Sequence, residues 1–172
     1  LVSFSCAKAI HLMIQSNVTD SLSAPPRVLI FDSGVGGLSI ADNIIAAMPW
    51  LDIVYASDNG FFPYGTKTEP ELMQRIGWVI NKLLHEHPVD LLVIACNTAS
   101  TLALTELRSQ FNLPIVGVVP AIKPAATLTR SNVIGLLATP ATVQRSYTHK
   151  LINDYAPHCQ VISAGSSQLV HI

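Results

Sequence analysis

Short apolar runs alternate with amphipathic segments along most of this chain, and this alternation constrains the fold more than any other feature. The apolar runs are often β-branched and scarcely interrupted by polar residues, which is typical of strands buried on both faces of a parallel sheet. We expect six such strands, at residues 28–31, 53–56, 91–95, 115–119, 133–138 and 161–164.

The segments between these runs carry helix signals. The clearest segment has apolar residues at spacings of three and four, and Thr68 and Glu71 fit a capping box at its start, with Pro70 in the first turn. Further helices are expected at residues 38–48, after Thr98, and from Thr139 and Pro140. Strands that alternate with helices pair in parallel through right-handed crossovers. The sequence therefore predicts an α/β fold, a three-layer α/β/α sandwich with a mostly parallel sheet.

The composition indicates that much of the surface is covered. Apolar residues make up 49% of the 172 residues, and charged residues only 12%, against roughly 25% charged residues in a typical soluble domain. A membrane-spanning helix needs about 20 mostly apolar residues, and the apolar runs here end sooner. We therefore expect no membrane partner, and we interpret the apolar excess as surface that another domain or molecule covers.

Charge and cysteine content limit the partners and the compartment. The formal net charge of -1 offers no attraction to a nucleic-acid backbone or an anionic membrane, so a small molecule or a protein is the expected partner. Cys6, Cys96 and Cys159 form no metal-binding spacing, and His85 and His87 are two residues apart and do not face one another, so no metal site is predicted. Unpaired cysteines and the lack of an evident secretory signal favour a reducing compartment, with the cytoplasm as the default.

Functional residues are expected beyond the carboxyl ends of the parallel strands. The first such loop, at residues 31–39, places three glycines after Asp32 and Ser33. Glycines let backbone amides approach a bound anion at the start of the next helix. An ordinary tight turn is the competing interpretation. A dinucleotide fingerprint is disfavoured because its third glycine is absent, and a phosphate loop is excluded because no Gly-Lys-Ser/Thr follows.

A second candidate loop follows the third expected strand. Cys96 lies at the tip of this strand, where the next helix begins, and the positive end of a helix dipole lowers the pKa of such a thiol. Asn97 adds donor and acceptor groups, and Thr98 can cap the helix or hold a carboxylate. A buried cysteine that acts as a small apolar residue is the alternative, and it is the only interpretation favoured for Cys6 and Cys159.

The third candidate loop, at residues 57–66, is rich in aromatic and turn residues. Such a loop can close over a small ligand, with the Tyr64 hydroxyl and the Gly65 amide as hydrogen-bonding groups. A rigid loop packed by its own rings is the alternative, and Asp58 is interpreted as a turn or capping residue. A thiolate beside a carboxylate and several amide donors suits proton abstraction next to a carboxylate, with the thiol as the base.

Five segments resemble glutamate racemase, in the same order and at similar spacing, and they cover nearly all of the chain after residue 26. They are FDSGVGGLS at 31–39, FPYGTK at 62–67, ACNTAS at 95–100, PIVGVVPAIKPA at 114–125 and GLLATPATVQRSYT at 135–148. The resemblance is closest to the proteobacterial form. Aspartate racemase and maleate isomerase share the architecture, but their loops match less well.

The resemblance implies an enzyme that interconverts L- and D-glutamate without pyridoxal phosphate or a metal, and that supplies D-glutamate for peptidoglycan. Two cysteines on opposite sides of the α-carbon remove and return its proton. On this chain Cys96 is then one acid/base group, and Asp32 assists the thiol and, with Ser33, binds the substrate. The remaining substrate contacts are Tyr64, Gly65, Asn97 and Thr98. The implied partners are glutamate, a nucleotide-linked peptidoglycan precursor as activator, and a second copy in a homodimer.

One part of the family pattern is missing. The second cysteine of the family lies in a Gly-Cys-Thr-His motif that this sequence lacks, and Cys159 is followed by Gln160 and Val161. The expected organisation is an N-terminal extension and linker at 1–26, an α/β domain with the catalytic cysteine at 27–130, and the start of a second α/β domain at 131–172.

We interpret the chain as a truncated half of a pseudo-symmetric two-domain racemase, which should bind glutamate weakly and should not interconvert its enantiomers. Its apolar excess should then lie largely around the mouths of the first three strands. Two alternatives stay open: a non-catalytic domain that binds an anionic ligand at residues 32–39, and a nucleotide-binding domain of Rossmann type.

Overall fold

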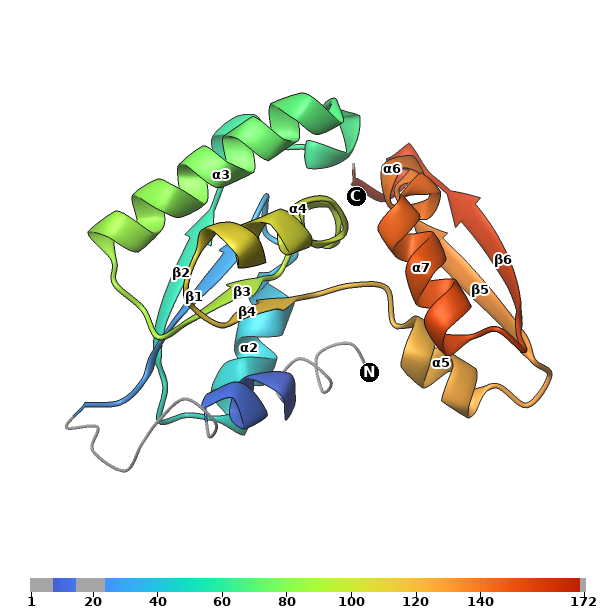
Figure 1. The fold of residues 1–172 in the computed structure, drawn as a ribbon, viewed down its shortest axis with the longest axis horizontal. Coiled ribbons are helices and arrows are strands. Elements are labelled where there is room, and N and C mark those ends of the chain that lie inside the picture. Colours follow the sequence, from blue (N-terminus) through green and yellow to red (C-terminus); the bar gives the residue numbers. More distant parts are fainter. Residues whose placement is uncertain (1–7, 15–23, 171–172) are drawn as a thin grey trace.

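The computed structural model describes residues 8–14 and 24–170, and its central feature is a parallel four-stranded sheet (Figure 1). The strands occur at the expected positions, and every pairing between them is parallel. Their order across the sheet places β1 and β3 side by side, so the loops that follow these two strands begin at neighbouring points of one edge. The strands, in the order in which they lie, are β2 (Asp52–Ser57), β1 (Arg27–Asp32), β3 (Leu91–Ile94) and β4 (Ile115–Gly117).

Helices cover both faces of this sheet, because successive side chains of a strand point to opposite sides. On one side, alternate side chains of β1 join a buried cluster with α2 (Leu38–Ala47). On the other side, the intervening side chains join a cluster with α3 (Glu69–Glu86) and α4 (Asn97–Gln110). The predicted three-layer α/β/α sandwich is confirmed in this part of the chain.

The start of α3 has the capping box that the sequence predicts. The Thr68 backbone N–H and hydroxyl both donate to the Glu71 carboxylate, at 3.0 and 2.6 Å. Pro70 lies in the first turn, where a missing N–H costs no intrahelical bond. The buried residues of α3 repeat every four positions from Leu72, which fixes the face that packs on the sheet.

Residues 8–14 form a short helix on the α2 side of the sheet, which the interpretation of 1–26 as an extension and linker missed (Figure 1). Ile10 and Ile14 are 0% and 6% exposed and join the same cluster as α2. Residues four positions apart share a helix face, so this helix presents both isoleucines to the core. The rest of the expected extension includes 1–7 and 15–23, which lie outside the described residues.

A second unit follows β4 and contains its own two-stranded parallel sheet. Its strands, β5 (Val133–Ala138) and β6 (Gln160–Gly165), also occur at the expected positions. Three helices pack against this sheet: α6 and α7 lie between it and α4 and contact α4, and α5 lies at the lower end, against α7 and β5 (Figure 1). They are α5 (Ile122–Leu128), α6 (Pro140–Gln144) and α7 (Ser146–Tyr155).

Two helices of the second unit differ from the sequence expectation. Thr139 caps α6 as predicted, since its hydroxyl accepts from the Thr142 N–H at 3.4 Å. The helix then stops at Arg145, whose backbone is extended (φ -68°, ψ 141°), and α7 begins at the next residue. The sequence also did not predict α5, whose Pro124 lies within its first turn, where proline is tolerated.

Exposed apolar side chains lie both at the strand mouths and on the outer face of the β5–β6 sheet. The first location is the one expected if a further domain closes over these mouths, but most of the exposed large apolar side chains of the described residues lie elsewhere. The second is a sheet face on which no other described element lies (Figure 1). The exposed residues are Val35, Leu38 and Phe62 near the mouths, and Val133, Leu137 and Ile162 on β5 and β6. Within the described ranges, no helix is long and apolar enough to cross a membrane.

Candidate active site

The candidate residues that follow β1 and β3 lie together at the carboxyl edge of the four-stranded sheet. The two strands are adjacent and parallel, and the Ser33 Oγ lies 3.2 Å from the Cys96 Sγ, within hydrogen-bond reach. Asp32, Ser33 and Cys96 are all buried, at 5%, 7% and 7% exposure. A carboxylate, a hydroxyl and a thiol are thus brought to one place, and such groups can perform acid/base chemistry.

The glycine-rich loop after β1 holds the Asp32 carboxylate in place. Its two oxygens accept from the backbone N–H groups of Ser33, at 2.8 Å, and of Gly37, at 2.7 Å. A Cβ at Gly37 would lie only 2.8 Å from the Asp32 Cβ and 3.0 Å from the Ala95 Cβ, so glycine is required here for close approach. The anion that these two amides bind is therefore the carboxylate of the chain itself, whereas the sequence suggested an external anion.

Cys96 lies at the N-cap of α4, as the sequence predicts, and its Sγ accepts from the Ala99 N–H at 3.5 Å. The pKa of the thiol is nevertheless raised, chiefly because burial removes water from the thiolate, and the Asp32 charge raises it further. The Ser33 hydroxyl and the amides of Ala99 and Thr98 act in the opposite direction and are outweighed. The prediction of a lowered pKa is therefore wrong, and Cys96 rests as the neutral thiol at neutral pH.

Tyr64 lies in η2 (Tyr64–Thr66), and its ring belongs to the same buried cluster as Cys96. Its hydroxyl, however, contacts Asp58 and not the thiol. That hydroxyl donates to Asp58 at 2.8 Å, and Arg75 donates to the same carboxylate at 2.8 and 2.6 Å. The hydrogen bond from Arg75 is the main cause that holds the pKa of Asp58 below its ordinary value. Asp58 is the N-cap residue of η1 (Asn59–Phe61), as a turn or capping residue would be, and its carbonyl accepts from the Phe61 N–H at 3.1 Å. Its side chain makes no capping bond and is instead the buried centre of this cluster.

The other candidate residues lie around the thiol in different settings. Gly65 packs against the second unit, where a Cβ would lie 3.4 Å from the Thr139 Cγ2. Asn97 is exposed in the first turn of α4, and Thr98 beside it is buried. Their roles as substrate contacts stay predictions.

Tyr55 belongs to the surroundings of the site, although sequence reasoning did not single it out. Tyr55 lies in β2, and its hydroxyl donates to the Gly34 carbonyl at 3.4 Å. Burial, together with the charges of Asp32 and Cys96, raises the pKa of Tyr55 to about 12. A tyrosine inside an apolar strand run carries no sequence signal that distinguishes it from a packing residue.

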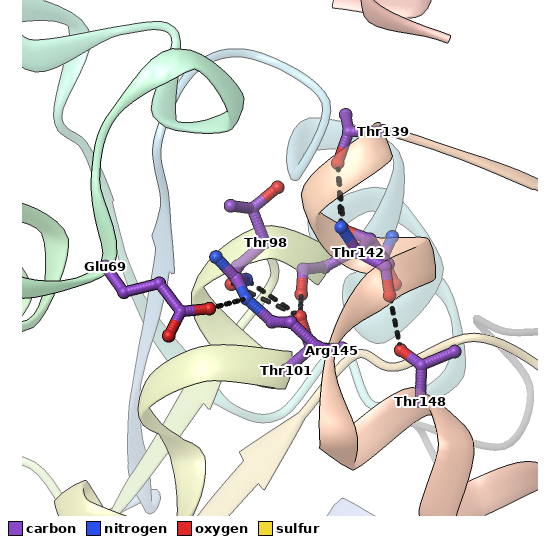
Figure 2. A network of polar contacts seen from close by, with 8 residues as sticks. Glu69, Thr98, Thr101, Thr139, Thr142, Arg145 and Thr148 are labelled. Atoms are coloured by element: carbon purple, nitrogen blue, oxygen red, sulfur yellow. Dashed lines mark hydrogen bonds and ion pairs between the residues drawn. The ribbon is translucent and has the colours of Figure 1, made fainter. Parts of the chain in front are cut away.

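Arg145 is the second residue near the site that sequence reasoning missed. Figure 2 shows its guanidinium extending from the break between α6 and α7 toward Thr98, Thr101 and Glu69. The Thr98 carbonyl accepts a hydrogen bond from Arg145, and Thr98 is two residues after Cys96 in the sequence. Arg145 lies within the segment 135–148 that resembles the family, but the sequence assigned it no role, because its importance depends on the contact between the two units.

Two cavities of the described chain lie away from Cys96, and Cys96 lines neither of them. One of about 260 Å³ lies beside the connection from β4 to α5 and is bordered by Val118, Lys123 and Tyr155. Another of about 190 Å³ lies between β2 and α3, beside Asp58 and Trp78. Among the residues that the structure describes, no three His, Cys, Asp or Glu side chains gather in a way that could hold a metal ion.

Comparison with known proteins finds similar sequences and structures that are named glutamate racemase. Glutamate racemase from Pectobacterium carotovorum subsp. carotovorum is 53% identical over 155 residues, which cover 90% of this chain and 54% of that protein. The crystal structure of Escherichia coli glutamate racemase with L-glutamate and the activator UDP-MurNAc-Ala has a TM-score of 0.80 at 51% identity, covering 86% of this chain and 55% of that one. Glutamate racemase isoform RacE1 from Bacillus anthracis has a TM-score of 0.78 at 30% identity, covering 87% and 55%.

The chain spans about half the length of the curated relatives that it matches. The sequence profile described as Asp/Glu/Hydantoin racemase matches residues 40–170, which are most of the chain. On this match, the chain belongs to the Asp/Glu/Hydantoin racemase family.

Proposed function

We propose that this chain forms one side of a glutamate racemase active site, in which Cys96 is one of two acid/base thiols. The observation that carries the proposal is the contact of 3.2 Å between the Ser33 Oγ and the Cys96 Sγ, next to the Asp32 carboxylate. Relatives at 53% and 51% identity that are named glutamate racemase support glutamate as the substrate.

The proposed reaction is proton transfer at the α-carbon of glutamate. The Cys96 thiolate takes the α-proton, so the Cα–H bond breaks, an S–H bond forms, and the electron pair stays on the α-carbon, conjugated with its carboxylate. A second thiol then gives a proton to the opposite face, which inverts the configuration. In the reverse direction Cys96 is the donor, and its raised pKa suits that role because the thiol is already protonated.

We expect the charges of the site to orient glutamate. Its ammonium group pairs with Asp32 and Ser33, and a carboxylate lies at the N-terminus of α4, near Asn97 and Thr98, where free amides favour an anion. An ammonium group beside Asp32 also offsets the negative charge that raises the pKa of Cys96. Substrate binding therefore makes the thiol easier to ionise at the moment when the base is needed. Tyr64 and Gly65 complete the contacts from the loop after β2.

The wider role follows from the same proposal. The protein that contains this chain supplies D-glutamate for peptidoglycan in the cytoplasm, without a cofactor, as a homodimer. The E. coli relative was crystallised with UDP-MurNAc-Ala as its activator, and we propose a nucleotide-linked peptidoglycan precursor of this kind as an activator here.

Circular dichroism of L-glutamate tests the proposal. With the 172-residue chain alone the ellipticity should stay constant, because Cys159 packs with the second unit and supplies no second thiol at Cys96. A longer polypeptide that adds a Gly-Cys-Thr-His segment should racemise glutamate. Cys96→Ser in that polypeptide should lower the rate by about a hundredfold or more, whereas the matched Cys159→Ser should leave it unchanged. A steady loss of ellipticity with the short chain, or full activity of the Cys96→Ser protein, contradicts the assigned roles.

A further inference from the structure

Arg145 connects the second unit to the helix that begins at Cys96. It lies between α6 and α7, and its side chain is only 4% exposed. Its Nη1 donates to the Thr98 carbonyl and, at 3.1 Å, to the Thr101 Oγ1, both in the first turns of α4 (Figure 2). Its Nε donates to Glu69 at 3.2 Å. A buried cation is thus fixed on the backbone of the helix that presents the thiol.

The carbonyl that Arg145 contacts belongs to the same peptide group as the N–H that contacts the thiol. The Thr98 C=O and the Ala99 N–H are the two ends of one amide, and the Ala99 N–H donates to the Cys96 Sγ at 3.5 Å. A cation on the oxygen end polarises the amide and makes its N–H a stronger donor. The guanidinium therefore increases the positive potential at the sulfur without touching it.

The charge of Arg145 is only partly neutralised. Its acidic partner, Glu69, is 64% exposed, so water screens that ion pair. The Arg145 Nη2 is buried and has no hydrogen-bond partner among the described residues. Arg75 is different, because its Nε and Nη2 both donate to Asp58, whose side chain is 5% exposed. Much of the positive charge of Arg145 is thus available to the Thr98 carbonyl.

A network of threonines holds the backbone that carries Arg145. The Thr139 hydroxyl donates to the Thr142 Oγ1 at 3.0 Å, and the Thr148 hydroxyl donates to the Thr142 carbonyl at 2.6 Å (Figure 2). Thr142 and Thr148 are 1% and 0% exposed. The first bond fixes the start of α6 and the second spans the break between α6 and α7, so the arginine is positioned by the second unit before any ligand binds.

We propose that Arg145 is a positioning residue that stabilises the thiolate form of Cys96 through the Thr98–Ala99 peptide, so that docking of the second unit sets the reactivity of the thiol. The meaning for catalysis rests on the proposed racemase function, but the effect on the thiol does not. The other titratable groups that interact with Cys96 are Asp32 from β1, Tyr55 from β2 and Tyr64 from η2. Asp32 opposes ionisation, and both tyrosines are neutral near pH 7, since the pKa of each lies above the ordinary tyrosine value.

Alkylation of Cys96 by iodoacetamide measures this effect, because only the thiolate reacts. The rate is followed from about pH 6.5 to about pH 10.5 in the 172-residue chain, with Cys96 separated from Cys6 and Cys159 by peptide mass spectrometry. For Arg145→Met we expect the pH midpoint to rise by about 0.5 to 1 unit, so the rate at pH 8 falls about three- to tenfold. The rate extrapolated to the fully ionised thiol should be unchanged. Arg145→Lys should recover part of the loss.

Two variants serve as controls. Arg108→Met removes another guanidinium that donates to a backbone carbonyl, that of Ile115, and it should leave the midpoint unchanged. Glu69→Gln removes the partial counter-charge and should lower the midpoint. An unchanged midpoint in both Arg145→Met and Glu69→Gln overturns the proposal.

Loss of structure is recognised separately from the effect on the thiol. A faster reaction of Cys159, which packs beside α7, would reveal opening of the second unit in Arg145→Met. If the second unit opens, the proposal is tested with Glu69→Gln and Arg145→Lys, because both variants keep the buried cation. An unchanged pH midpoint of alkylation in Glu69→Gln then overturns the proposal. No glutamate is present in the assay, so a failure of the racemase proposal leaves its outcome unaffected.

Discussion

Asp58 is the centre of a buried cluster at the carboxyl end of β2. Its carboxylate accepts from Tyr64 and twice from Arg75, and these bonds hold the pKa of Asp58 below its ordinary value in the folded chain, with the bond from Arg75 the largest cause. A depressed pKa in the folded state stabilises the fold above the ordinary aspartate pKa. This contribution is lost as the pH falls from that value through the lowered one.

Asp58→Asn should therefore lower stability at neutral pH and flatten the acid dependence of unfolding below about pH 4. Removing one partner of a buried ion pair costs about 3 kcal/mol, and we expect about 2 to 3 kcal/mol because Arg75 is 32% exposed. Urea unfolding at several pH values measures both effects. Asp52→Asn is the matched control, since its ion pair with Arg27 is exposed and should cost less than about 1 kcal/mol. Equal losses for the two variants would contradict the argument.

Single residues show where sequence reasoning succeeds and where it stops. The place of Cys96 at the start of a helix, and its position near Asp32, could be predicted because parallel strands end at one edge. The direction of its pKa shift could not, because the burial that raises it comes from packing of β1, η2 and α4 around the sulfur. The buried ion pair of Asp58 could not be predicted for the same reason, since its partner Arg75 is seventeen residues away on α3.

At the scale of elements, the helix at residues 8–14 shows how a short segment becomes part of the core. Its sequence spans only two turns, too few for an apolar period to stand out, and such a helix gains its stability from packing. Ile10 is fully buried, whereas Leu12 in the same helix is 56% exposed. The break at Arg145 escaped prediction because it follows from threonine hydrogen bonds and not from a glycine or a proline.

Ile10→Ala should lower the free energy of unfolding by about 2 to 4 kcal/mol, because it leaves a cavity beneath the sheet. Leu12→Ala, in the same helix, should cost less than about 0.5 kcal/mol since its side chain already meets solvent. Chemical denaturation of the two proteins measures the difference. A loss for Ile10→Ala as small as that for Leu12→Ala would mean that this helix does not belong to the cooperative core.

At the scale of the whole molecule, all six strands could be placed from their apolar runs, but their division between two sheets could not. A run of apolar residues specifies burial, and it does not name the neighbouring strand. In the structure β4 pairs only with β3 among the described strands, and β5 pairs with β6 in a separate sheet. The two units meet where α4 and η2 contact α6, and where α4 contacts α7, and the contact of α4 also places Arg145.

The outer face of the β5–β6 sheet has a consequence for the behaviour of the whole chain. Val133 and Leu137 alternate along β5, and Gly135 between them pairs with Ile162 of β6, so the three apolar side chains share one face. They are 40%, 63% and 58% exposed, although both faces of a parallel sheet are normally covered. An exposed apolar face of this kind favours association with another molecule.

We therefore expect the 172-residue chain to self-associate as its concentration rises, with a sedimentation coefficient that increases accordingly. Replacing both Leu137 and Ile162 by lysine should keep the chain monomeric over the same concentrations, because two like charges on that face oppose its burial. Trp78→Lys is the matched control: Trp78 is 56% exposed, but Arg75 and Lys82 already flank its ring on α3, so its replacement should leave association unchanged. If the double variant sediments like the parent chain, another surface drives the association.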